Sequence, residues 1–239
     1  MTNMSDKNTD GLRPIGKIWG FFRWSLIGYI IASTLMVLSN IHLHIFLLRA
    51  FEGEAPIPNI ESEGLFLDAH QAIIAISTLV MVVLAFVSYA RFFQRSMYNA
   101  RQLEPGEDTV SPMGMWLWNI VPFASFWMPF KGVRQVWDIM RANAGEEQNY
   151  PATFGIWWIL WVISSIISNI SWRLPGGGFD FVLSEYNYGD LLTVNWMDMV
   201  AGTMTAISAF ALLSIATKIA NLQKGFSLES PSRLKEVFE

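Results

Sequence analysis

The feature that most constrains this chain is a set of five long apolar runs without Asp, Glu, Lys or Arg. They lie at 24–48, 69–90, 113–130, 154–172 and 199–217. A helix needs about 20 such residues to cross the hydrocarbon core of a bilayer. Of the 239 residues, 15% are charged, whereas about a quarter are charged in an ordinary soluble domain. The sequence therefore predicts an all-α polytopic membrane protein.

The distribution of basic residues decides which runs are expected to cross. Short loops rich in Lys and Arg remain cytoplasmic. If all five runs crossed, the 16 basic residues would divide evenly, whereas 14 share one side if the third run does not cross. We therefore predict four transmembrane helices in a membrane domain spanning 18–222, with the other four runs as the spans. Residues 1–17 and 223–239 are expected to be cytoplasmic tails.

The third run contains its own reason not to form a continuous span. Pro112, Pro122 and Pro129 interrupt it, and proline removes a helical donor and bends the chain. Backbone groups freed in this way cannot face lipid, so the segment must turn within protein or at the water interface. We predict that 112–130 is a proline-broken re-entrant or interfacial segment.

An amphipathic surface helix is predicted directly after this segment, over 130–142. Its apolar and polar residues separate at helical spacing, and a helix of this kind is expected to lie along the cytoplasmic surface. The apolar face holds Phe130, Val133, Trp137 and Met140, and the polar face holds Lys131, Arg134, Gln135, Asp138 and Arg141.

Several residues between 99 and 141 form an ordered pattern. They are Asn99, Arg101, Leu103, Ser111, Pro112, Trp116, Trp118, Pro122, Trp127, Pro129, Val133 and Trp137. In this set the chain resembles the bacterial membrane family catalogued as domain of unknown function 4328. It departs from the family pattern at 113–115 and in an acidic insert at 104–108. The resemblance implies a multi-span protein of a bacterial plasma membrane with no assigned activity, and it offers no catalytic residue.

Enzymatic function is not expected. The sequence contains no Gly-x-Ser-x-Gly elbow, no His-Glu-x-x-His zinc helix and no glycine-rich phosphate loop, which are common signatures of hydrolases, metalloenzymes and nucleotide-binding enzymes. The absence of cysteine excludes thiol chemistry and cysteine metal ligation. The basic residues follow the apolar runs and form no one-sided basic face, so no nucleic acid partner is expected. No cofactor is predicted.

The leading hypothesis is a non-catalytic accessory or scaffold subunit that binds an anionic lipid or a membrane-protein partner at the broken segment. Asn99 and Arg101 precede this segment and are expected to satisfy carbonyls freed by Pro122 and Pro129. Arginines around it could bind lipid headgroups, although their simpler role is to set topology. The candidate binding residues are Asn99, Arg101, Pro122, Trp127, Pro129, Arg134 and Trp137.

Two other functions stay open. A small channel or transporter could use the re-entrant segment as part of its pathway, because irregular backbone at membrane depth serves such sites. A haem- or metal-binding redox protein could use His70 with His42 or His44. Positions two apart on a helix point about 200° away from each other, so His42 and His44 are not expected to share an ion.

Overall fold

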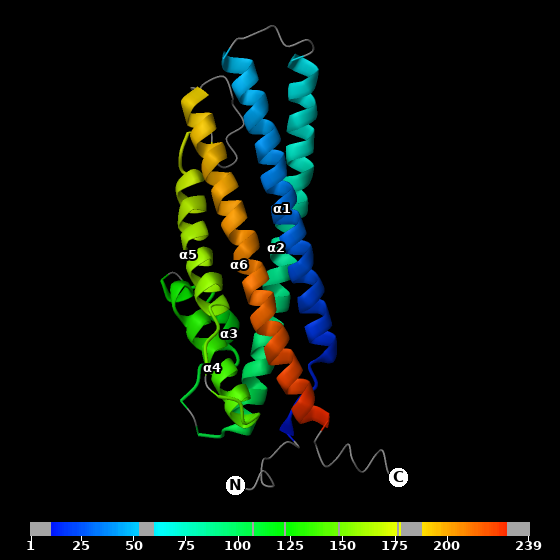
Figure 1. Ribbon diagram of the computed structural model, residues 1–239, viewed down its shortest axis with the longest axis vertical. Helices are drawn as coiled ribbons and strands as arrows, with labels where there is room; N and C mark the ends of the chain where they lie inside the picture. Colours follow the sequence, from blue (N-terminus) through cyan, green and yellow to red (C-terminus); the bar gives the residue numbers. More distant parts are fainter. Residues whose placement is uncertain are drawn as a thin grey trace. The chain divides into compact units, whose positions relative to one another are not determined.

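The computed structural model describes residues 11–52, 60–106, 108–121, 123–147, 149–175, 177 and 188–228, and every regular element among them is helical. Figure 1 shows these elements along the chain. They are α1 (Gly16–Glu52), α2 (Ile60–Leu103), α3 (Gly114–Leu117), the 3-10 helix η3 (Ala124–Phe126), α4 (Met128–Asn143), α5 (Thr153–Ser171) and α6 (Tyr188–Leu228).

Four of these helices, α1, α2, α5 and α6, are long and apolar enough to cross a membrane. The prediction of an all-α chain with four such helices is confirmed. The bounds of α5 agree with the predicted span to within one residue at each end, but α1, α2 and α6 extend well beyond theirs. At 1.5 Å per residue, the 44 residues of α2 measure about 66 Å, roughly twice the thickness of the hydrocarbon core.

The extension of α2 has a physical reason. After the apolar run, the residues from Arg91 to Leu103 include no proline or glycine and still place one face in a core. Phe92, Phe93 and Met97 on that face are completely buried. Apolar sequence therefore indicates where a helix can cross lipid, while packing determines where it ends.

The chain divides into two compact units, and α1, α2 and α6 contribute residues to both. Unit 1 comprises Met1–Ser25, Leu84–Phe154 and Leu212–Glu239, and unit 2 comprises Leu26–Val83 and Gly155–Ala211. Among the described residues, every Lys and Arg except Arg49 and Arg173 belongs to unit 1. This is the grouping expected if the third run does not cross.

Aromatic side chains of α1 and α2 form the core of unit 1. Phe22 stacks on Phe92, with ring centroids 5.1 Å apart, and meets Phe93 edge to face at 5.9 Å. Trp19 and Tyr89 complete the cluster, at 5.4 Å from Phe92 and 4.7 Å from Phe93 respectively. Such tilted and stacked pairs add to the stability that burial of the rings provides.

Unit 2 is joined by hydrogen bonds between helices. Ser39 of α1 is paired with His70 of α2 at 3.1 Å, and Ser171 of α5 donates to Asp198 of α6 at 2.6 Å. Its outward faces are rich in exposed isoleucine, leucine and valine, including Ile73 and Ile76 of α2. An apolar exterior combined with polar groups paired between helices suits helices in a bilayer.

Candidate binding surface around the broken segment

The third apolar run is divided into two short pieces. The hydroxyl of Ser111 accepts a hydrogen bond from Gly114 N at 3.0 Å. Gly114 is the first residue of α3, which is only four residues long. A turn follows, and η3 adds three residues before α4. Phe123 lies between α3 and η3 and has a φ of 63°, a backbone conformation that is rare for a bulky residue. The predicted break is confirmed, while Pro122 lies outside the described residues.

Large apolar side chains of this segment are exposed. Phe123 is 87% exposed, Trp127 64% and Ile120 60%. The other exposed members are Met113, Leu117, Trp118, Val121 and Phe126. Exposed apolar side chains in this number on neighbouring residues are typical of surfaces that bind lipid or another protein. We refer to these eight side chains as the apolar platform.

Helix α4 supports the apolar platform and is amphipathic as predicted. Val133, Val136 and Met140 are fully buried, whereas Lys131 and Arg134 are exposed. Pro129 lies in the first turn, where its missing N–H breaks no helical bond.

A glycine of α4 allows close contact with α3. A Cβ placed on Gly132 would lie 2.5 Å from the sulfur of Met115, which is 1% exposed. The absence of a side chain at Gly132 therefore lets α3 pack directly on α4.

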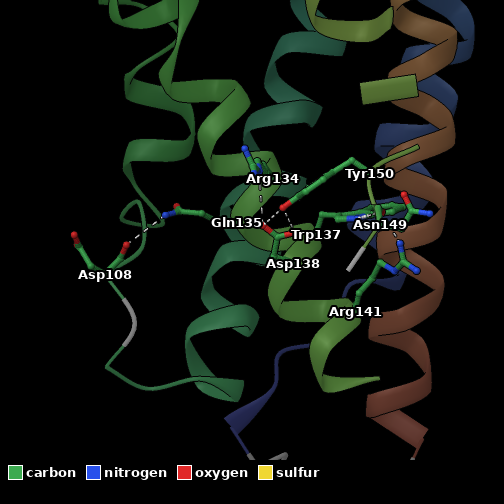
Figure 2. Close-up of polar contacts among 8 residues, drawn as sticks. All are labelled: Asp108, Arg134, Gln135, Trp137, Asp138, Arg141, Asn149 and Tyr150. Atoms are coloured by element: carbon green, nitrogen blue, oxygen red, sulfur yellow. Dashed lines mark hydrogen bonds and ion pairs between the residues drawn. The ribbon is translucent and has the colours of Figure 1, made fainter. Parts of the chain in front are cut away.

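Polar side chains of α2 and α4 hold the loop between α2 and α3, which leads into the apolar platform. Arg101 of α2 donates from Nε to Thr109 Oγ1 at 2.8 Å and from a terminal nitrogen to Thr109 O at 2.7 Å. Gln135 of α4 accepts from Val110 N at 2.9 Å and donates to Asp108 O at 3.3 Å. Figure 2 shows the contact between Gln135 and Asp108. The loop is thus bonded to α2 at Thr109 and to α4 at Asp108 and Val110.

On the other side of α4, Asp138 contacts both Arg134 and Tyr150 (Figure 2). The Tyr150 hydroxyl lies 2.5 Å from each oxygen of the Asp138 carboxylate. The Arg134 guanidinium lies 4.4 Å from the Tyr150 ring centre and 3.8 Å from Asp138. Partial burial is the main cause of the raised pKa of Tyr150, and the hydrogen bond to Asp138 adds to it. Tyr150 therefore remains a neutral donor.

Tyr150 belongs to the linker between α4 and α5, and a second set of contacts attaches this linker further along α4. Asn149 O accepts hydrogen bonds from Trp137 Nε1 at 3.3 Å and from Arg141 at 2.6 Å (Figure 2). Glu146 forms ion pairs with Arg141 at 3.0 Å and with Lys218 of α6 at 2.6 Å. The hydrogen bond from Lys218 is the main cause of the lowered pKa of Glu146. These contacts fix the linker between α4 and α5 to unit 1.

The predicted partners of Asn99 and Arg101 are wrong. Asn99 is 3% exposed; its side chain bonds both main-chain groups of Arg13 at 3.0 Å and donates to Gln223 Oε1 at 2.9 Å. Arg101 bonds Thr109. Both side chains have polar partners outside the broken segment: those of Asn99 are brought to it by long-range packing, whereas Thr109 lies only eight positions after Arg101.

The other predicted residues divide into two groups. Trp127 belongs to the exposed platform, whereas Pro129 and Trp137 are buried on the inner face of α4. Arg134 is exposed but occupied by Tyr150 and Asp138. Sequence reasoning missed Tyr150, Asn149, Glu146 and Lys218. The only signal for the first three was their position just after an amphipathic helix, and Lys218 of α6 had none.

The histidines have separate surroundings within unit 2. His44 is paired with Asn195 of α6 at 3.1 Å, and His70 is paired with Ser39 and stacks on Phe66. His42 is exposed. In the described part of the chain, no group of three or more His, Asp or Glu side chains has the arrangement of a metal site.

Comparison with known proteins gives one result. No curated protein and no solved structure matches the chain. The family model described as domain of unknown function DUF4328 matches residues 65–221, about two thirds of the chain, from α2 through the broken segment to α6. The chain therefore belongs to the DUF4328 family.

Proposed function

We propose that the protein is a non-catalytic accessory or scaffold protein of a bacterial plasma membrane. The apolar platform is its binding surface, and lipid or a neighbouring membrane protein is its partner. The observation that carries the proposal is the exposure of eight apolar side chains between Met113 and Trp127, beside the exposed Lys131 of α4. Aromatic and aliphatic side chains next to a cation suit the boundary between headgroups and acyl chains.

The surface is built on a supported frame, which favours tight binding of a partner. α4 is packed along its inner face, and its loops are fixed at Thr109 and Asn149. A rigid base beneath an exposed apolar surface lowers the conformational entropy lost when a partner binds. The grouping of basic residues in unit 1 supports a cytoplasmic location for this surface and for both termini.

The test uses the natural absence of cysteine. Single cysteines replace Ile120 or Trp127 on the platform, with Ala142 on the exposed side of α4 as the control. Spin labels at 120 and 127 should collide more with oxygen, which dissolves in lipid, than with a water-soluble nickel complex. The label at 142 should show the reverse. Equal exposure of all three labels to water would contradict the proposal.

A second measurement separates the two kinds of partner. A photoreactive group attached at 120 or 127 in intact membranes would be cross-linked to lipid if the platform is a lipid surface. Repeated cross-linking to one protein band, absent with the group at 142, would identify a partner subunit instead.

A further inference from the structure

Three arginines of unit 1 share one surface and have no acidic partner among the described residues. Arg91 and Arg95 are four apart on α2, so their side chains share a helix face with Tyr98 and Gln102. The guanidinium of Arg13 lies over the Tyr98 ring, 3.7 Å from its centre. This arrangement brings a third positive charge to the same face. We name Arg13, Arg91 and Arg95 the arginine stripe.

The other arginines near the platform differ because their groups are already used. Arg101, Arg134 and Arg141 bond Thr109, Asp138 and Asn149 respectively. The ion pairs between described residues involve Arg49, Arg134, Arg141 and Lys218, and none includes a member of the stripe. Like charges four apart on a helix repel each other, so the stripe costs stability unless an anion lies against it.

The chain also fixes the position of Arg13. Asn99 accepts from Arg13 N and donates to Arg13 O, each at 3.0 Å, which holds the main chain against α2. Gly11 packs beside Gln102, where a Cβ would lie 2.8 Å from the side-chain oxygen. Ile15 is 3% exposed. The N-terminal segment is thus held along the same face of α2, and the guanidinium is placed before any ligand arrives.

We infer that the arginine stripe binds the phosphate of an anionic lipid headgroup. Arg91 follows the last residue of the predicted span 69–90, at the level where headgroups lie on either side of a membrane. Guanidinium groups pair with phosphate through two parallel hydrogen bonds, and basic surfaces beside membrane helices bind anionic lipids. The stripe shares no residue with the apolar platform, so this inference does not rest on the proposed function.

The test measures how phosphatidylglycerol binds the full-length protein in zwitterionic detergent, by native mass spectrometry and by thermal stabilisation. Arg91→Gln with Arg95→Gln should weaken apparent affinity about twenty-five-fold, at about a factor of five for each basic residue near an anionic surface. The control removes two charges elsewhere, with Arg173→Gln and Lys224→Gln, both exposed. It should leave the affinity unchanged.

Equal weakening by both double variants, or none by the first, would overturn the inference. If the first variant does not fold, Arg91→Lys with Arg95→Lys keeps the charge but loses the paired geometry. It should still weaken binding several-fold, and unchanged affinity would contradict the site. Inorganic phosphate is added in a separate arm. Stabilisation by phosphate equal to that by lipid would overturn the assignment to a headgroup.

Discussion

The buried amide of Asn99 allows a prediction with a worked magnitude. It makes two hydrogen bonds with the main chain of Arg13 and one with Gln223, which is 2% exposed. Asn99→Ala removes all three hydrogen bonds, and the net loss for each is about 1 kcal/mol. We expect the free energy of unfolding to fall by about 3 kcal/mol.

Reversible unfolding in mixed detergent micelles measures this change. Asn169→Ala is the matched control, because its amide is exposed and donates to Ser165 O of its own helix, at 2.9 Å. The control should change stability by less than about 0.5 kcal/mol. A single hydrogen bond between helices in a bilayer contributes about 0.6 kcal/mol on average. A loss for Asn99→Ala no larger than that would refute the reasoning that the three bonds of Asn99 together stabilise unit 1.

Three further changes test other parts of the structure. Arg101→Ala removes two bonds to the loop and should lower the melting temperature in detergent, and unchanged melting would contradict that role. Gly202→Val places a Cβ 2.8 Å from a methyl of Val37 of α1 and should lower the free energy of unfolding by about 1–3 kcal/mol, whereas Gly155→Val, whose Cβ meets nothing within 4 Å, should cost less. Glu146 has a lowered pKa, so its contribution is complete above the ordinary value of about 4.3 and is lost as pH falls through the folded value. Glu146→Gln should therefore flatten the fall of melting temperature in acid, and parallel curves would contradict it.

The long helices and the broken segment could be predicted because their causes are local. An uncharged run of about 20 residues and the spacing of prolines are properties of the sequence itself. The amphipathic pattern of α4 was equally local, and its buried residues include Val133 and Met140 as expected.

The partners of the polar residues could not be predicted for the opposite reason. Asn99 is bonded to residues 86 and 124 positions away, and Glu146 is paired with a lysine 72 positions away. Which amide meets which carbonyl depends on helix register and on packing of the aromatic core. Helix ends depended on the same packing, so apolar length alone underestimated α1, α2 and α6.

The central claim is that the third apolar run does not cross the membrane. The most direct measurement introduces single cysteines at Ser62, Glu147 and Pro175, all exposed, and treats intact cells with an impermeant thiol reagent. We predict labelling at 62 and 175 with protection at 147, where labelling should appear only after the cells are opened. Labelling at 62 and 147 with protection at 175 would show that the broken segment crosses, and would contradict the four-span account.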